Sequence, residues 1–235
     1  LDKNTLVLTL GYNTAIFNIL YRFWGIPNII NMDGIEWKRD KWSFLAKSWF
    51  WFNERMGCYC GNHLVADHPE IQKHLATRVR ESKITTIAYG GLEVTSSDES
   101  ILEDYNLAKR KYAIVIARPE PENSIYEIVQ GFSNKKRNFK LVVLGKYDLS
   151  NNYHKKVIDA ASEDVLFIGA IYDIKVVSAL RFFSALYIHG HTVGGTNPSL
   201  VESLGTGNAV IAHDNKFNRW VAKDGAIYFS NSDDI

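Results

Sequence analysis

The residues best suited to chemistry lie between 188 and 215, in the string IHGHTVGGTNPSLVESLGTGNAVIAHDN. The apolar start of this string predicts a buried strand, and the glycines after it predict a loop. Asn197 and Pro198 then have the types preferred at a helix N-cap and at the first helical position. Because the first amides of a helix carry partial positive charge, we expect this helix start to favour an anion such as a phosphate.

Glu202 follows one turn into the expected helix. A carboxylate at that place could accept hydrogen bonds from hydroxyl groups of the ligand whose phosphate sits at the helix start. A phosphate that carries a sugar or a ribose would satisfy both parts of such a site. The alternative is an ordinary strand–loop–helix unit with a glutamate that faces solvent.

This segment resembles the donor-binding signature of the family 4 retaining glycosyltransferases, in which E-x7-E precedes a turn of small residues and a valine-rich strand. Glu202 matches the second glutamate, which the resemblance assigns to the ribose of the nucleotide. Gly194 stands at the first glutamate position, so the usual contact to the sugar hydroxyls has no counterpart here. The string GGTNPSLVE is similar to the rhamnosyltransferase-like branch of bacterial polysaccharide synthesis. The donor-binding residues implied by this match are Gly194, Gly195, Thr196, Asn197, Pro198, Ser199 and Leu200.

Two further positions follow expected strands of the second half. Arg118 comes directly after the apolar run that starts at Tyr112, and a guanidinium there can bind a diphosphate through two hydrogen bonds. The resemblance implies a lysine five residues later, but Asn123 occupies that position, so one cation of the usual pair is missing. Tyr172 lies in a loop that the resemblance assigns to the nucleobase, where its ring either stacks on the base or packs on the protein.

A third candidate site lies in the first half, in the string NMDGIEWKR. It resembles the family string that faces the reacting sugar, with Asp33 at the position of the usual histidine. A carboxylate there could stabilise a developing oxocarbenium ion or orient the acceptor hydroxyl. The alternative is an aspartate in a turn with Gly34. We expect Glu36, Lys38 and Arg39 on the acceptor side.

The elements that position these residues alternate between strand and helix along the whole chain, which is typical of parallel α/β folds. The polar stretch that ends at residue 103 predicts a join between two domains, residues 1–103 on the acceptor side and residues 104–235 on the donor side. In the second half the expected strands cover residues 112–117, 140–145, 165–168, 185–189, 209–213 and 226–229. The resemblance implies a GT-B fold of two facing Rossmann-like domains. We expect the N-terminal domain to be incomplete, because the chain starts without methionine, directly in an expected strand.

Composition narrows the classes of function. The chain has 235 residues, of which 46% are hydrophobic and 13% aromatic, enough to bury a substantial core. The 27 basic and 26 acidic residues nearly cancel, which argues against nucleic acid as a partner. The two cysteines, Cys58 and Cys60, are too close in sequence to bridge readily and predict buried thiols in a reducing cytoplasm. The histidines show no metal-binding spacing.

An expected helix at residues 42–56 is rich in aromatic and basic residues. This mixture is compatible with a helix that rests on an anionic membrane, and equally with a crossover helix packed on the sheet, which we favour. Taken together, the sequence predicts a cytoplasmic, metal-independent glycosyltransferase, with peripheral contact at the inner face of the plasma membrane as a further hypothesis. Its donor would be a nucleotide-diphosphate sugar and its acceptor a polysaccharide or a lipid-linked glycan. The alternative is a non-catalytic sugar-nucleotide-binding protein.

Overall fold

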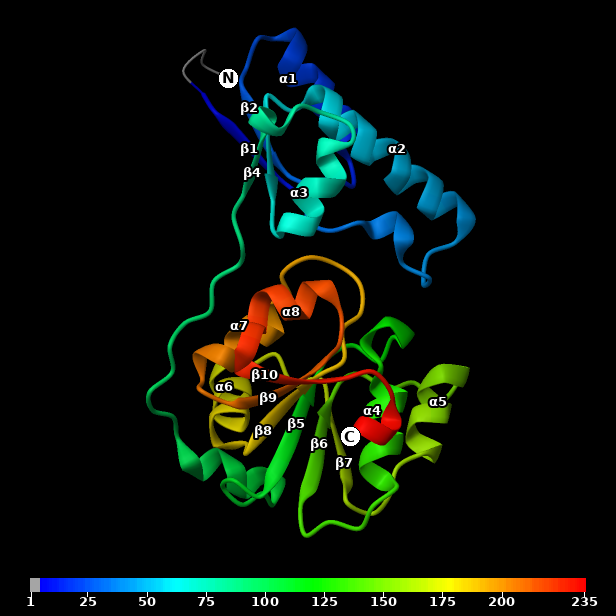
Figure 1. Ribbon diagram of the computed structural model, residues 1–235, viewed down its shortest axis with the longest axis vertical. Helices are drawn as coiled ribbons and strands as arrows, with labels where there is room; N and C mark the ends of the chain where they lie inside the picture. Colours follow the sequence, from blue (N-terminus) through cyan, green and yellow to red (C-terminus); the bar gives the residue numbers. More distant parts are fainter. Residues whose placement is uncertain (1–4) are drawn as a thin grey trace. The chain divides into compact units, whose positions relative to one another are not determined.

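The computed structural model describes residues 5–235, which form two compact units (Figure 1). The first unit extends to Tyr89 and includes the loop residues 193–196, and the second comprises residues 90–192 and 197–235. The division therefore falls before the polar stretch and not after residue 103, where we expected it. The reason is the 3-10 helix η4 (Glu99–Tyr105), whose Leu102 is buried in the core of the second unit.

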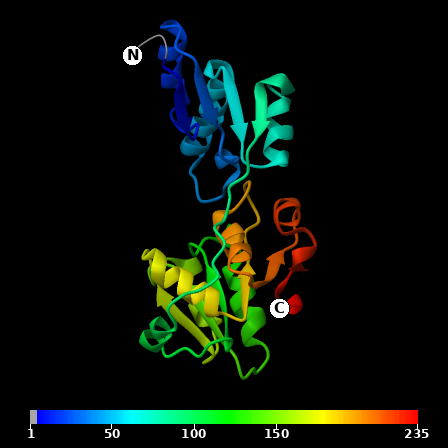
Figure 2. The ribbon, with the colours of Figure 1, turned by 90° about the vertical axis from the view of Figure 1, so that its left-hand side faces the viewer.

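The first unit is built on a four-stranded parallel sheet in the order β1-β2-β3-β4. These strands lie side by side in the blue-to-green part of Figure 2. Their bounds are β1 Val7–Leu10, β2 Asn28–Asn31, β3 His63–Ala66 and β4 Ile84–Thr86. The helices of this unit are α1 Ile19–Phe23, α2 Phe44–Cys60 and α3 Pro69–Ala76. Two 3-10 helices, η1 Ala15–Asn18 and η2 Glu36–Lys38, pack against α2.

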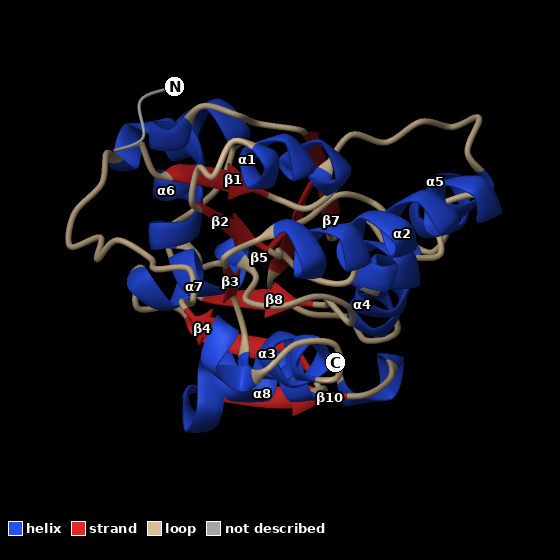
Figure 3. Cartoon of the chain, turned by 90° about the horizontal axis from the view of Figure 1, so that it is seen from above, coloured by secondary structure: helices blue, strands red, loops and turns tan. Residues whose placement is uncertain are grey.

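The second unit is built on a six-stranded parallel sheet in the order β10-β9-β8-β5-β6-β7. Its strands are β5 Tyr112–Ile116, β6 Lys140–Leu144, β7 Val165–Gly169, β8 Leu186–His189, β9 Ala209–His213 and β10 Ala226–Phe229. Its helices are α4 Ile125–Ser133, α5 Asn152–Asp159, α6 Ile174–Phe183, α7 Pro198–Gly205 and α8 Lys216–Ala222, drawn in blue against the red strands in Figure 3. With β5 as its first strand, this is the doubly wound order of dinucleotide-binding folds.

The sheet of the second unit is buried on both faces, which explains its nearly continuous apolar strands. In β5, Tyr112 and Ile114 belong to one core cluster, with residues of α6, α7 and α8. Ala113 and Val115 belong to another, with residues of α4 and α5. This alternation follows from the two-residue period of a strand.

The sequence placed most elements within a few residues of their observed bounds. The largest difference is α2, which continues to Cys60 and so includes both cysteines. Both thiols are free and buried, as expected, and burial raises the pKa of Cys58 to about 11. Among residues 5–235 there is no helix with the length and apolar character needed to cross a membrane.

Candidate functional site

The site lies where the order of the second sheet reverses. β5 pairs with β6 on one side and with β8 on the other, and the helices that follow β5 and β8, α4 and α7, pack on opposite faces of the sheet. In folds of this order, ligands bind at this switch point, beyond the carboxyl ends of the strands. The sequence of the two loops therefore decides what can bind.

The two loops pack so closely that one position requires glycine. A Cβ added to Gly190, directly after β8, would collide with the carbonyl oxygen of Asn123 in the loop after β5. The hydroxyl and the amide of Thr192 both donate to the carbonyl of Glu122. These contacts fix the loops relative to each other and so fix the shape of the switch point.

A cavity of about 430 Å³ opens at the carboxyl ends of β5, β6 and β7. It brings together Arg118 and Tyr172, two of the residues selected from the sequence, although they are 54 positions apart in the chain. The ring of Tyr172 is almost fully exposed, so it is free of the packing role that the sequence left open. The lining residues are Ile116, Ala117, Arg118, Pro119, Glu120, Leu144, Gly145, Lys146, His154, Ala170, Ile171 and Tyr172.

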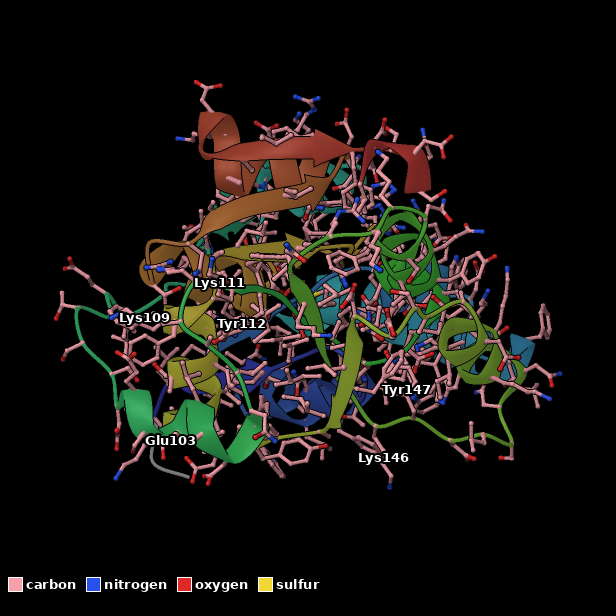
Figure 4. The ribbon with its side chains drawn as sticks, turned by 90° about the horizontal axis from the view of Figure 1, so that it is seen from below. Glu103, Lys109, Lys111, Tyr112, Lys146 and Tyr147 are labelled. Carbon is pink, nitrogen blue, oxygen red and sulfur yellow. The ribbon has the colours of Figure 1, made fainter. Side chains whose placement is uncertain are left out.

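Lys146 is a second cation of this cavity, and the sequence analysis did not select it. Lys146 and Tyr147, both labelled in Figure 4, follow the carboxyl end of the strand β6. Lys109 and Lys111, labelled in the same figure, precede β5 and therefore lie at the amino ends of the strands, away from the cavity. The lysine that the resemblance implies five residues after Arg118 is replaced by Asn123, but Lys146 supplies a cation to the same cavity from the neighbouring strand. The signal that could have identified Lys146 is its place directly after the strand β6 and Gly145.

Asn123 has a positioning role. Its side-chain amide donates to the carbonyl oxygen of Arg118 at 2.8 Å, and its side-chain oxygen is hydrogen-bonded to Nδ1 of His191. Asn123 is buried and does not line the cavity. The two ends of the Asn123 side-chain amide group therefore connect the loop that carries Arg118 to the loop after β8.

The start of α7 has the geometry expected from the sequence. Asn197 is the N-cap, and its side-chain oxygen accepts from the amide of Ser199 at 3.0 Å, with Pro198 in the first turn. The amide of Leu200 donates to the carbonyl of Asn197, and the Leu200 side chain is fully buried in the core. The amides of Ser199 and Leu200 already donate to Asn197. A bound anion would therefore interact mainly with the dipole at the N-terminus of α7.

A buried hydrogen-bond network connects α7 to the strands beneath it. The hydroxyl of Tyr187 donates to Oγ of Ser199 at 2.8 Å, and Oγ of Ser199 donates to the carbonyl of Ile116 at 3.3 Å. Tyr187 also contacts Nδ1 of His189 at 3.2 Å. Burial, together with the neighbouring His191, lowers the pKa of His189 to about 3, so this imidazole is neutral at neutral pH.

Glu202 forms an ion pair that was not expected from the sequence. Its Oε2 lies 2.8 Å from Nη2 of Arg181, and the Arg181 side chain is 6% exposed while that of Glu202 is 49% exposed. Glu202 does not line the cavity that contains Arg118. The carboxylate is nevertheless accessible, and Arg181 holds it in one orientation.

The loop residues 193–196 belong to the first unit. There the amide of Thr196 donates to Oδ2 of Asp67 at 2.9 Å, and the Thr196 hydroxyl donates to the Asp67 carbonyl at 2.5 Å. A Cβ added to Gly195 would collide with the same carboxylate. Gly194 has a φ of 125°, which explains a glycine where the resemblance implies a glutamate. Burial raises the pKa of Asp67 to about 6.

The candidate acceptor-side residues of the first unit differ in what holds them. Asp33 has a φ of 22° and accepts from the hydroxyl of Tyr89 at 3.2 Å, in an exposed position. Glu36 and Arg39 form an ion pair at 3.3 Å, and both side chains are largely buried. Lys38 lies over the ring of Trp37. Asp33 is thus accessible to a ligand, whereas Glu36 and Arg39 neutralise each other.

Within residues 5–235 there is no cluster of three or more histidine, cysteine, aspartate or glutamate side chains placed to hold a metal ion. Besides Tyr172, the ionisable side chains that line the cavity are those of Arg118, Glu120, Lys146 and His154. This set is suited to an anionic ligand, because it contains an arginine and a lysine, which bind phosphate groups.

Comparison with known proteins gives the fold a context. Residues 7–92 match the model of a domain of unknown function, DUF1972. No curated protein matches the sequence. Among solved structures, HepE from Anabaena in complex with UDP superposes with a TM-score of 0.76 at 14% identity, over 97% of this chain and 66% of HepE. Sucrose-phosphate synthase from Thermosynechococcus elongatus superposes with a TM-score of 0.76 at 13% identity, over 97% of this chain and 61% of the synthase. A glycosyltransferase from Rickettsia africae gives a TM-score of 0.65 at 13% identity, over 94% and 67% of the two chains.

The chain has the α/β fold of these proteins. The expected GT-B class, with parallel sheets in both units, is confirmed. The chain spans about two thirds of the length of HepE and of the Rickettsia protein, and 61% of the synthase. At such low identity the likeness concerns the fold, and the chemistry has to be argued from the residues described above.

Proposed function

We propose that this protein is a glycosyltransferase that takes a sugar from a nucleotide-diphosphate donor bound at the switch point of the second unit. The observation that carries the proposal is the convergence of Arg118, Lys146 and Tyr172 on one cavity at the carboxyl ends of β5–β7. Two cations suit a diphosphate, and an exposed aromatic ring suits a nucleobase. HepE, which has the same fold, binds UDP and UDP-glucose.

The proposed roles follow from these positions. Arg118 and Lys146 neutralise the diphosphate, with the dipole of α7 as an additional positive end. Tyr172 stacks on the base, and Glu202, oriented by Arg181, accepts hydrogen bonds from the ribose hydroxyls. The loop residues Gly194–Thr196 were selected from the sequence as donor contacts and stay a prediction.

In the proposed reaction, the bond between the anomeric carbon and the β-phosphate oxygen breaks, and its electron pair goes to the phosphate. The acceptor hydroxyl forms the new bond to the anomeric carbon and loses its proton to the departing phosphate. Stabilising the leaving group is then the main task of the protein. We propose that no metal ion takes part, because two cationic side chains and a helix dipole supply the positive charge. Retention of configuration rests on the family resemblance, and Asp33 is the candidate for stabilising charge on the sugar or orienting the acceptor.

The resemblance to the rhamnosyltransferase branch makes deoxythymidine-diphosphate-rhamnose the first donor to test. The proposed acceptor is a growing polysaccharide or a lipid-linked glycan. An acceptor on a lipid would place the reaction in the cytoplasm, at the inner face of the plasma membrane.

The experiment is a thermal-shift panel with nucleoside diphosphates and nucleotide sugars, followed by an assay for release of the nucleoside diphosphate. A true donor present at a hundred times its Kd should add about 2.7 kcal/mol of apparent stability. Arg118→Ala should remove that shift, whereas Lys135→Ala, an exposed lysine outside the cavity, should keep it. If no nucleotide shifts the wild-type protein, the proposal is wrong.

The second candidate is a sugar-nucleotide-binding protein without activity. The absence of the first signature glutamate and of the lysine after Arg118 favours it. Binding of a nucleotide sugar without release of the diphosphate, with every acceptor class tested, would select this candidate over the transferase.

A further inference from the structure

The first unit contains a second cavity that the proposed reaction does not use. It has a volume of about 380 Å³ and is lined by four cationic side chains, together with three further residues. The cations are Arg22, Arg55, Arg78 and Lys83, and the other lining residues are Cys58, Tyr59 and Val79. A cavity lined by four cations attracts anions.

The backbone holds these cations in place but does not cancel their charge. Arg22 donates to the carbonyl of Tyr59 at 3.0 Å, Lys83 to that of Cys58 at 2.7 Å, and Arg55 to that of Trp51 at 3.1 Å. Among the described residues, Arg78 is the member of the four that forms an ion pair, with the buried Glu54 at 2.9 Å. Glu54 is the one acidic residue in helices α1 and α2.

The four charges also repel one another. Partial burial and the neighbouring Arg78 hold the pKa of the Arg55 guanidinium below its ordinary value. Burial likewise lowers the pKa of the Lys83 ammonium, and Arg22 contributes to the lowering. An anion in the cavity would relieve this repulsion.

Exposed aromatic side chains lie next to two of the cations that line the cavity. Arg22 lies 4.9 Å from the ring centre of Tyr59, and Arg55 lies 3.3 Å from that of Trp51. Both rings are exposed, as are Phe23 at 78% and Trp24 at 63%, which follow Arg22 in the chain. At the opposite end of α2, Phe44 and Leu45 are also exposed. Core packing, which the sequence favours for the aromatic residues of this helix, does not hold for Phe44, Trp49, Trp51 and Phe52, which are exposed.

We propose that this face of the first unit, formed by α1, α2 and the cationic cavity, binds the surface of a bilayer that contains anionic phospholipid. The cavity would accept a phosphate headgroup, and the aromatic side chains would enter the interfacial layer. Tyrosine and tryptophan are the residues that prefer this layer, since one end of each ring is apolar and the other is polar. Basic side chains near an anionic leaflet each add to the affinity. The proposal is independent of sugar transfer.

The test is sedimentation of the full chain with vesicles of phosphatidylcholine, alone or mixed with phosphatidylglycerol. We expect binding only to the mixed vesicles. The double variant Arg22→Gln, Arg55→Gln should lower the partition coefficient by at least about tenfold, because each cation contributes on the order of 1 kcal/mol. The matched control Lys135→Gln, Lys136→Gln removes two exposed lysines of the second unit and should bind as the wild type does.

The aromatic part is tested with Phe23→Ser, Trp24→Ser, which should also weaken vesicle binding. Its control is Leu149→Ser, Ile174→Ser, two equally exposed apolar residues of the second unit. Circular dichroism and UDP affinity, measured on each variant, should be unchanged, which separates this proposal from the function of the donor site. The proposal is overturned if the wild type ignores mixed vesicles, if either control loses as much binding as its partner variant, or if only free phosphate or glycerol phosphate binds to the cavity.

Discussion

The buried guanidinium of Arg181 is paired with the half-exposed carboxylate of Glu202, with 2.8 Å between Nη2 and Oε2. The second contact of the same nitrogen is Oγ of Ser199, in the first turn of α7, at 3.4 Å. Arg181 therefore orients the carboxylate and at the same time anchors the helix that carries it. A glutamate held in this way loses little conformational entropy when a ligand binds to it.

Replacement of Glu202 should separate ligand binding from folding. Glu202→Ala is expected to weaken the binding of a nucleoside diphosphate by about tenfold, because a charge-assisted hydrogen bond to ribose is lost. Its affinity for inorganic pyrophosphate, which has no ribose, should not change. Titration calorimetry with both ligands makes the comparison, and an equal loss for both would remove Glu202 from the ribose site.

The same substitution leaves the guanidinium of Arg181 buried without its partner. We expect the free energy of unfolding to fall by about 1 kcal/mol, a value reduced by the exposure of Glu202 to solvent. Glu202→Gln, which keeps an oxygen acceptor for Arg181, should lose less.

The two cations of the donor cavity should act on the same part of the ligand. Arg118→Ala is expected to weaken UDP binding by about 10- to 100-fold, and Lys146→Ala by a smaller factor, since Arg118 can bind bidentately. Uridine, which has no phosphate, should bind both variants and the wild type alike. Calorimetry with UDP and uridine tests this, and a variant that lost uridine binding would show a role other than neutralising phosphate.

Gly190 and Asn123 offer a test of loop packing. Gly190→Ala places a Cβ against the Asn123 carbonyl, so the loops must separate, and we expect a loss of about 1–3 kcal/mol of stability. Gly225→Ala is the control, because a Cβ at that position meets no atom of the described chain within 4 Å. Urea unfolding and hydrogen exchange of the β5 and β8 peptides provide the measurements. Equal stability of the two variants would contradict the close approach of the loops.

His189 should make the second unit sensitive to acid. Its folded-state pKa is about 3, below the ordinary value of about 6.5, so the unfolded chain binds a proton that the folded chain excludes. The contribution to stability is complete above about pH 6.5 and is lost as the pH falls toward 3. From about pH 7 to pH 5 the loss should amount to about 2 kcal/mol.

The measurement is urea unfolding of the full chain at both pH values, with hydrogen exchange of the β8 peptides. His189→Phe keeps an aromatic ring that cannot take up a proton, and leaves the Tyr187 hydroxyl bonded to Ser199. Its stability should depend less on pH over this range than that of the wild type. An unchanged pH dependence would assign the effect to another group.

The sequence by itself determined the α/β fold class, because the spacing of apolar residues and the turn residues between the elements are local signals. Strands β9 and β10 have the bounds that their apolar runs predicted, and Asn197 caps α7 as its type and the following proline indicated. The sequence also selected Arg118 and Tyr172 separately, Arg118 from its place directly after an expected strand and Tyr172 from a loop that the resemblance assigns to the nucleobase.

Only the tertiary structure decided which residues meet. Lys146 reaches the cavity of Arg118 because β6 pairs with β5, and Arg181 reaches Glu202 because α6 packs beside α7. The boundary between the units also required the structure, since Leu102 lies in a polar stretch and is buried by residues far along the chain. The physical reason is the same in each case: contacts between distant segments depend on strand order and helix packing, and neither is a property of a local stretch of sequence.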